Sequence, residues 1–234
     1  MDRGAPSPWT DAPVRWGVPD VLIAWVVGVV AGLIVAAPFV DEANEIPPAG
    51  IAASVYAQNI AIVVALAFIA RMKGRGSLGT DFGFRLDVRA IWWVAAGVGV
   101  ALLGNLFVLP LTELAGLDDS AQDVVNKFEA ASPSVKAIFF PGVVLLAPIA
   151  EELLFRGALL RSLQRHWSPG MAVFVSAMVF SVIHLVDPDT YYYLPAFLLL
   201  GLVSGWRAVV SGNLTQSIFL HAGFNLVASI LIVT

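Results

Sequence analysis

The segment VLIAWVVGVVAGLIVAAPFV, residues 21–40, decides the fold class because it contains no charged side chain. A helix needs roughly 20 apolar residues to cross the hydrocarbon core of a lipid bilayer. Backbone amides find no water in that core, so a continuous apolar run of this length is expected to be helical. The run lacks a clear small-residue cleavage site and is longer than a signal-peptide core. We therefore predict that residues 21–40 form the first membrane helix.

The rest of the chain repeats this pattern. Of its 234 residues, 59% are hydrophobic and only 13% are charged, and the mean hydropathy is +0.84, which excludes an ordinary soluble domain. Six further apolar runs follow, at residues 50–70, 90–116, 136–160, 168–186, 191–210 and 213–233. We predict an all-α polytopic membrane helical bundle of about seven transmembrane helices, or eight if an interfacial or broken helix is counted. The absence of cysteine excludes disulfides and thiol catalysis.

Charged residues are segregated between alternate loops. The basic set is Arg71, Lys73, Arg75, Arg85, Arg89, Arg161, Arg165 and Arg207, and the acidic set is Asp41, Glu42, Glu45, Asp118, Asp119, Asp123, Glu129, Asp187 and Asp189. Cytoplasmic loops carry an excess of Lys and Arg, so we predict a multi-pass cell-membrane protein with its N-terminus in the cytoplasm and its C-terminus outside. The basic loop 71–89 is interpreted as an orientation signal that also contacts anionic headgroups. Residues 120–131 begin with a serine cap and predict a short interfacial helix.

Small and cyclic residues mark where helices approach or bend. Gly28 with Gly32, and Gly201 with Gly205, have the four-residue spacing that lets membrane helices pack closely. Pro148 lies inside the fourth apolar run, where it removes a backbone donor. We therefore predict that this helix is bent or loosened just before the residues that follow Pro148.

Ionisable residues follow shortly after Pro148. The stretch APIAEELLFRG, residues 147–157, carries Glu151, Glu152 and Arg156 within a predicted membrane span. Ionisable groups in a span mark a functional site or a tightly paired structural one. Glu152 and Arg156 are four residues apart in the favourable order and predict an ion pair along one helical face. Glu151 points about 100° away from Glu152 and is left without a local partner.

Two later runs carry polar pairs with the same spacing. Phe180 and His184 lie four residues apart in the fifth run, and His221 and Asn225 lie four apart in the seventh. Each pair therefore shares one helical face. The third histidine, His166, lies in a predicted turn and is interpreted as incidental.

These residue types suit hydrolysis of an amide, which needs a base for water, a proton donor for the leaving amine and donors for the oxyanion. Glu151, helped by His184, could act as base and proton shuttle, and His221 with Asn225 could form an oxyanion hole. Alternatively, Glu151, His184 and His221 could bind Zn²⁺ with water in the fourth position. The residues alone leave both alternatives open.

Other protease chemistries lack their residues. A His-Glu-x-x-His motif and a Gly-x-Ser-x-Gly elbow are absent, and no aspartate lies within an apolar run to form a dyad. The three motifs that remain are Glu-Glu-x-x-x-Arg, Phe-x-x-x-His and His-x-x-x-Asn on successive late helices. In this order they resemble the motifs of the CPBP family, which groups the CAAX prenyl endopeptidase Rce1 with bacterial Abi-type proteins. The resemblance covers about residues 136–230.

The resemblance implies an intramembrane endopeptidase of a type often labelled a metalloprotease, with zinc as its conceivable cofactor. It implies that Glu151 activates water with His184 as its partner, and that His221 and Asn225 stabilise the oxyanion. Glu152 and Arg156 then resemble a pair that shapes the site or holds substrate, beside Phe180. It also implies three parts: a polar tail over 1–20, membrane helices and loops over 21–135, and a catalytic domain over 136–234. The expected partners are a membrane-associated peptide or protein substrate and the bilayer, with no nucleic acid.

Two other classes of function remain compatible with the sequence. The first is a non-catalytic membrane scaffold or bacteriocin-immunity protein of the same fold, and the second is a transporter that uses the polar groups as a proton relay. The catalytic hypothesis has its own difficulty, because the predicted helix ends place Glu151 and His184 at different depths. A bent fourth helix that extends to about Arg165 would bring them together.

Overall fold

The computed structural model describes residues 14–115, 127–128, 130–185 and 188–233, and every regular element within them is helical. The order is α1 (Val18–Ala36), η1 (Ala37–Phe39), α2 (Pro48–Lys73), α3 (Leu78–Phe82), η2 (Val88–Ala90), α4 (Trp93–Ala115), α6 (Pro133–Pro141), η3 (Gly142–Leu146), α7 (Ala147–Glu152), η4 (Leu153–Leu159), α8 (Leu160–Gln164), α9 (Pro169–Ile183), η5 (Pro188–Tyr193), α10 (Leu194–Ser211) and α11 (Thr215–Val233). The predicted all-α fold is confirmed. Most of the predicted interfacial helix at 120–131 lies outside the described residues.

All seven predicted apolar runs coincide with helices. Five helical stretches are long and apolar enough to cross a membrane, namely Val18–Phe39, Pro48–Lys73, Val88–Leu111, Pro133–Gln164 and Tyr191–Ser211. The two other runs form α9, an apolar helix of 15 residues, and α11. The chain is thus a polytopic membrane helical bundle, and a total of seven spans stays a prediction.

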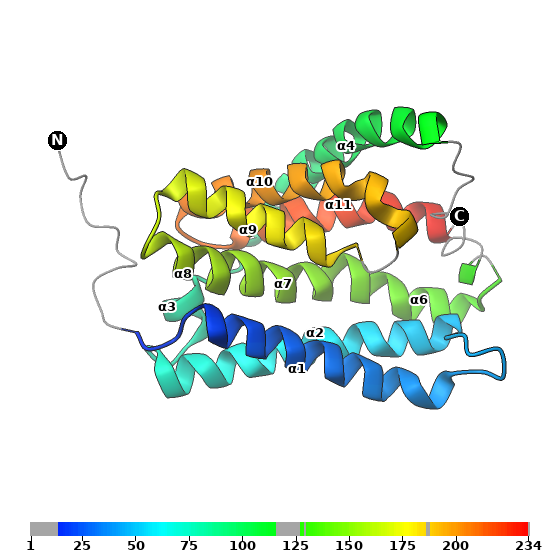
Figure 1. Cartoon of the computed structure of the whole chain (residues 1–234), viewed down its shortest axis with the longest axis horizontal. Helices are drawn as coiled ribbons and strands as arrows, with labels where there is room; N and C mark the ends of the chain where they lie inside the picture. Colours follow the sequence, from blue (N-terminus) through cyan, green and yellow to red (C-terminus); the bar gives the residue numbers. More distant parts are fainter. Residues whose placement is uncertain (1–13, 116–126, 129, 186–187, 234) are drawn as a thin grey trace.

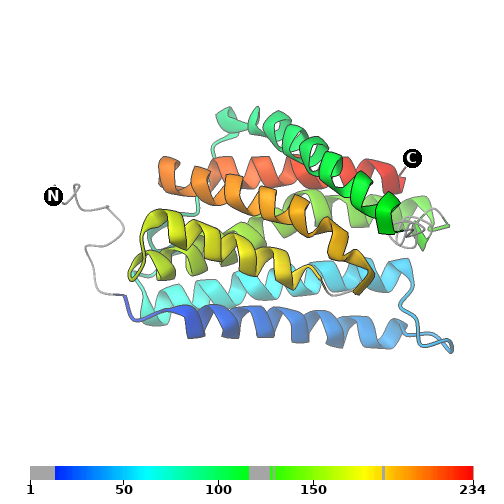
Figure 2. The ribbon, with the colours of Figure 1, turned by 45° about the horizontal axis from the view of Figure 1, so that its top comes forward.

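The helices lie side by side along the long axis of the molecule (Figure 1). α1 packs on α2, α9 packs on α10, and α4 packs on α11. The continuous stretch from α6 to α8 runs through the middle, between the α1–α2 pair and the group formed by α9, α10 and α11 (Figures 1 and 2). This central helix is therefore surrounded by protein on most sides, and its polar residues come to lie inside the bundle.

The central helix is interrupted twice. It starts after Ser132, whose hydroxyl caps the first turn, and runs through Gln164. Between its α-helical parts, η3 and η4 are π-helical turns, in which a backbone N–H bonds the carbonyl five residues earlier. π-turns occur mostly as single interruptions of α-helices, frequently at functional sites. The predicted extension to about residue 165 is confirmed, and α7 with its two glutamates is held between the two π-turns.

Glycines set the closest helix contacts. A Cβ on Gly28 would overlap Ile62 of α2, and a Cβ on Gly201 would lie 2.8 Å from the Cβ of Ala177 in α9, so both predicted glycine pairs mark close approaches. The closest approach was not predicted. A Cβ on Gly97 of α4 would overlap the backbone carbonyl of Leu220 in α11.

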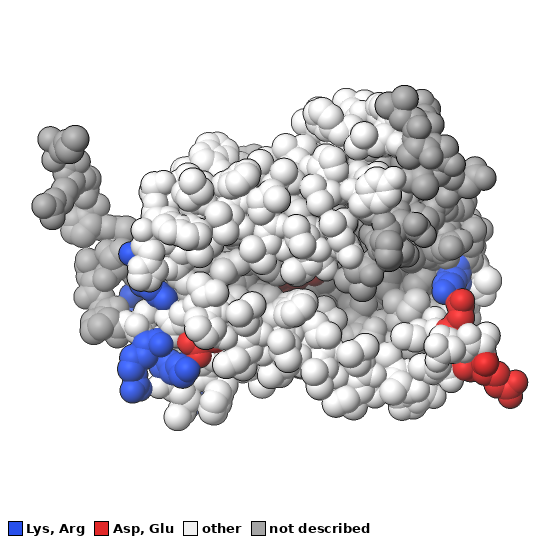
Figure 3. Space-filling view, viewed as in Figure 1, with Lys and Arg blue, Asp and Glu red and all other residues white. Residues whose placement is uncertain are grey.

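Charge is segregated between the two ends of the bundle. On the face shown in Figure 3, most Lys and Arg side chains gather at the end where α1 begins, and most of the acidic ones gather at the opposite end. The basic loop is also partly folded, since it contains α3, where Asp81 is buried and accepts a hydrogen bond from Trp16 Nε1 at 2.9 Å. The cytoplasmic location of this end stays a prediction.

Candidate active site

Three of the predicted site residues meet in the middle of the bundle. Glu151 comes from α7, His184 directly follows α9, and His221 lies in α11. The Oε2 atom of Glu151 is 3.6 Å from Nε2 of His184 and 3.7 Å from Nε2 of His221. The depth mismatch expected from the predicted helix ends is therefore absent. The two histidines approach one carboxylate oxygen from helices that are far apart in the sequence.

The other ring nitrogen of each histidine, Nδ1, has a hydrogen-bond partner of its own. Nδ1 of His184 lies 2.7 Å from the backbone carbonyl oxygen of Phe180, and Nδ1 of His221 lies 2.9 Å from Oε1 of Glu152. A carbonyl oxygen and a carboxylate can only accept, so both Nδ1 atoms donate. In the neutral rings, both Nε2 atoms then carry lone pairs toward Glu151 Oε2, which is buried and has no hydrogen-bond partner of its own. Three acceptors facing one another require a shared proton or a donor such as water.

Glu152 and Arg156 form the predicted ion pair. Their side chains are fully buried, and Arg156 Nη1 lies 3.1 Å from Glu152 Oε1. The guanidinium also sits over the ring of Phe180, with Cζ 4.4 Å from the ring centroid. The ring of Phe180 in turn meets His221 edge-on, at a centroid distance of 5.6 Å. The three residues expected to support the site thus pack directly behind His221.

Asn225 makes a hydrogen bond that the sequence did not predict. Its Nδ2 donates to the backbone carbonyl of Val143 in η3, at 2.9 Å. In the π-turn the next backbone partner of that carbonyl would be residue 148, and Pro148 has no N–H. Asn225 therefore supplies the donor that Pro148 lacks, and ties α11 to the central helix about two turns before the glutamates.

This substitution of one donor for another gives a double-mutant prediction. Asn225→Leu alone should lower the free energy of unfolding by about 1–3 kcal/mol, because the Val143 carbonyl loses its partner. In a Pro148→Ala background, the new N–H of residue 148 can reach that carbonyl, so Asn225→Leu should then cost about 1 kcal/mol less. Reversible unfolding in mixed micelles measures both steps. Equal costs in the two backgrounds would show that Pro148 and Asn225 do not share this carbonyl.

The zinc alternative gains no support from the arrangement of the side chains. Among the residues that the structure describes, no group of three or more His, Cys, Asp or Glu side chains is placed so as to hold a metal ion. The residue types of Glu151, His184 and His221 suit zinc, and metal binding by them stays a hypothesis. The chemistry below is therefore derived from the protein groups and water alone.

The site is partly open on one side. The side chains of Glu151 and His184 are 18% and 25% exposed, whereas that of His221 is 2% exposed. In Figure 3, acidic atoms show at the bottom of a hollow in the middle of the apolar face. Glu152, the other acidic residue of α7, is fully buried, so Glu151 is the partly exposed carboxylate of this helix.

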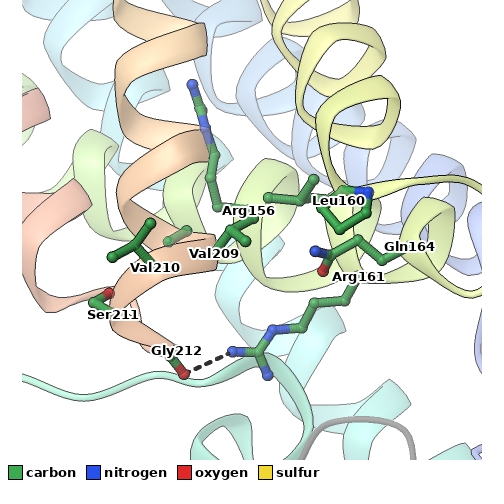
Figure 4. A pocket seen from close by; sticks show the side chains of 10 residues that line it. Arg156, Leu160, Arg161, Gln164, Val209, Val210, Ser211 and Gly212 are labelled. Atoms are coloured by element: carbon green, nitrogen blue, oxygen red, sulfur yellow. Dashed lines mark hydrogen bonds between the residues drawn. The ribbon is translucent and has the colours of Figure 1, made fainter. Parts of the chain in front are cut away.

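A separate cavity of about 470 Å³ lies between α8, the start of α9 and the end of α10 (Figure 4). It shares Arg156 with the candidate site but is not lined by Glu151, His184 or His221. In Figure 4 the side chain of Arg156 points away from Arg161, whose guanidinium bonds the carbonyl of Gly212 at the opposite end. This cavity is not the space around the two histidines.

The predicted site residues all fall within one segment that has known relatives. The segment 133–227 matches the model of the family described as type II CAAX prenyl endopeptidase, Rce1-like. Residues 133–227 thus resemble an Rce1-like domain. No curated protein and no solved structure matches the chain. The Rce1-like domain confirms the resemblance seen in the three motifs, and at the level of the family it indicates a CAAX protease-like membrane endopeptidase.

Two contacts within residues 133–227 were not predicted from the sequence. One is the hydrogen bond between Glu152 and His221, and the other is the bond from Asn225 to Val143. Pro148 was the available signal for the bond from Asn225, because a proline within a helix leaves a carbonyl without a backbone donor. Residue spacing gave no signal for the bond between Glu152 and His221, because these residues lie on two helices and are 69 residues apart in the sequence.

Proposed function

We propose that this protein is an intramembrane endopeptidase in which Glu151 and His184 activate a water molecule. The observation that carries the proposal is the convergence of two histidine Nε2 atoms on Glu151 Oε2, at 3.6 and 3.7 Å. Glu151 Oε2 and His184 Nε2 can together accept both protons of one water molecule, which suits a general base. We also propose residues 136–234 as the catalytic domain, with the match at 133–227 in support.

The proposed reaction uses each group at one atom. A proton moves from water to Glu151 while the water oxygen forms a bond to the peptide carbonyl carbon, and the carbonyl electrons move to its oxygen. His221 enters this step as the imidazolium, with Nδ1–H bonded to Glu152 and a further proton on Nε2 that donates to the oxyanion and stays on His221 throughout. The second Nδ2 proton of Asn225 is the other donor that we assign. The carbonyl then re-forms, the C–N bond breaks, and the amine takes the proton from Glu151 by way of His184. The products are a carboxylic acid and an amine.

The substrate that fits this site reaches it from within the bilayer. The face shown in Figure 3 has a hollow with acidic atoms near its middle and no other visible charge there, and the Glu151 side chain is 18% exposed. The neighbouring helices present apolar side chains on their outer surfaces, including Val26 and Val30 of α1 and Val182 of α9. A peptide held in the membrane by an apolar helix or a lipid anchor can approach along such a face, whereas a soluble peptide would first have to leave water.

The test is cleavage of membrane-tethered peptides by the purified protein in lipid vesicles. We expect the wild-type protein to cleave a tethered peptide faster than the same peptide without its anchor. Glu151→Gln keeps the shape of the side chain but removes the base, and should lower cleavage by roughly 100-fold or more. The matched control is Glu42→Gln, which changes an exposed glutamate in the loop between α1 and α2 and should leave cleavage unchanged.

Two results would contradict the proposal. Cleavage that is equal in Glu151→Gln and in wild type would remove Glu151 from the reaction. No cleavage by the wild-type protein across a varied library of tethered peptides would favour the non-catalytic scaffold instead.

A further inference from the structure

We infer that Glu152, held by Arg156, is a positioning residue that fixes the tautomer and orientation of His221. Its effect on cleavage rests on the proposed function, but the tautomer itself does not. One oxygen atom of Glu152 contacts both partners. Glu152 Oε1 lies 2.9 Å from Nδ1 of His221 and 3.1 Å from Nη1 of Arg156.

Burial makes this oxygen an acceptor. The side chains of Glu152 and Arg156 have no exposed surface, and that of His221 is 2% exposed. A guanidinium cannot be deprotonated in a protein, so its neighbour within ion-pair distance is the carboxylate anion and not the acid. The hydrogen bond from His221 Nδ1 to this anion is charge-assisted, and such bonds are about twice as strong as neutral ones. The proton shared between Glu152 and His221 therefore stays on Nδ1.

The ring is held in its plane as well as in its tautomer. Phe180, which is fully buried, meets the His221 ring at 85°, and Arg156 covers the same phenyl ring from another side. Rotating the imidazole about its own axis would break the bond to Glu152 and place a nitrogen against the phenyl edge. The groups that face His221 are thus Glu151 and Glu152 from α7, Arg156 from η4 and Phe180 from α9.

The consequence concerns the opposite side of the ring. With the proton on Nδ1, Nε2 points its lone pair toward Glu151 and can receive a proton there. Once it does so, the positive ring lies between two carboxylates, and Glu152 stabilises the charge as the buried aspartate does in a Ser-His-Asp triad. Glu152 touches neither the substrate nor the water, so it acts only through His221.

His184 supplies a reference within the same molecule. Its Nδ1 donates to a backbone carbonyl, that of Phe180, which no side-chain substitution removes. The chain has only three histidines, and the third, His166, is exposed. In protein labelled with ¹⁵N in its histidine rings, protonated and bare nitrogens resonate far apart, so three rings give an assignable spectrum.

The decisive variant replaces both charges of the buried pair at once. Glu152→Met with Arg156→Met removes the acceptor of Nδ1 without leaving an unpaired buried charge, an exchange that proteins often tolerate. Nδ1–H would then have no partner, whereas Nε2–H could donate to Glu151. We expect the proton of His221 to move from Nδ1 to Nε2 while the His184 and His166 signals keep their tautomers. We expect cleavage to fall about 100-fold, as for other losses of orientation.

A conservative variant separates tautomer control from general packing. Glu152→Gln with Arg156→Met keeps an amide oxygen that can accept from Nδ1, so it should retain part of the Nδ1–H population and more cleavage than the double methionine variant. His221 protonated on Nδ1 in both variants, or on Nε2 alone in the wild-type protein, would overturn the inference. A tautomer switch in a protein that never cleaves peptides would overturn the proposed function alone.

Discussion

Replacing Gly97 by alanine is expected to force α4 away from α11 and to abolish most activity. The new methyl group would overlap the backbone carbonyl of Leu220 and lie 2.9 Å from the backbone nitrogen of Phe224. Backbone atoms cannot swing aside as a flexible side chain can. The free energy of unfolding should fall by about 3 kcal/mol, the upper part of the range for overpacked cores. His221 lies next to Leu220, so a 1 Å shift of α11 should lower cleavage by roughly 100-fold.

Gly99 is the matched control for this substitution. It lies two residues further along α4, and a Cβ placed on it meets no atom within 4 Å. Gly99→Ala should leave unfolding and cleavage unchanged or slightly improved, because alanine favours helix over glycine. If Gly97→Ala unfolds at the same denaturant concentration as Gly99→Ala, then the close contact between α4 and α11 is not present in the membrane.

The second large effect is expected from Arg156→Met. This change removes one partner of a fully buried ion pair and leaves the Glu152 carboxylate in the apolar interior. Breaking such a pair on one side lowers stability by about 3–5 kcal/mol. We expect the lower end of this range, about 3 kcal/mol, because Glu152 keeps its hydrogen bond from His221. Reversible unfolding in mixed micelles measures the loss.

The rescue of Arg156→Met distinguishes buried charge from lost packing. Adding Glu152→Met removes the stranded carboxylate and should restore most of the stability, although not the cleavage activity. The exposed pair between Arg89 and Asp87 provides the surface control, since surface pairs contribute little. Arg89→Met should therefore change stability far less than Arg156→Met. A double methionine variant as unstable as Arg156→Met would mean that the arginine acts through its contacts with Phe180 and not through its charge.

Hydrophobic runs predicted the helices of this protein well. Every run found in the sequence is helical, because a bilayer leaves the backbone no other way to satisfy its amides over such a length. The ion pair of Glu152 with Arg156 was also predictable, since it lies within one helix and depends only on spacing.

Contacts between helices were harder to predict. Gly28 and Gly201 each belong to a pair with four-residue spacing, which a single helix reveals. Gly97 has no such partner in α4, and its counterpart Gly223, whose own Cβ would overlap the carbonyl of Val94, lies on α11. Such complementary glycines become visible only when the two helices are placed against each other.

The three motifs predicted that Glu151, His184 and His221 lie together. The depths in the membrane that were inferred from the predicted helix ends did not. Helix ends read from the sequence placed Glu151 and His184 apart, because an apolar run does not show where a helix bends or how far it continues into polar residues. The hydrogen bond of Asn225 to Val143 was not predicted. The Asn225 amide donates to the Val143 carbonyl, which has no backbone donor because η3 is a π-turn and residue 148 is proline. Hydrophobic periodicity does not reveal a π-turn.

The π-turn at Gly142–Leu146 gives the two halves of the central helix independent helical phases. In an uninterrupted α-helix, each residue advances the face by about 100°, so the face that α6 turns toward α2 would dictate where α7 turns its glutamates. The extra residue held in the turn breaks this dependence. The packing of α6 and the direction of the Glu151 side chain can then evolve separately. A one-residue deletion in this turn would couple them again, because it would rotate one half of the helix relative to the other.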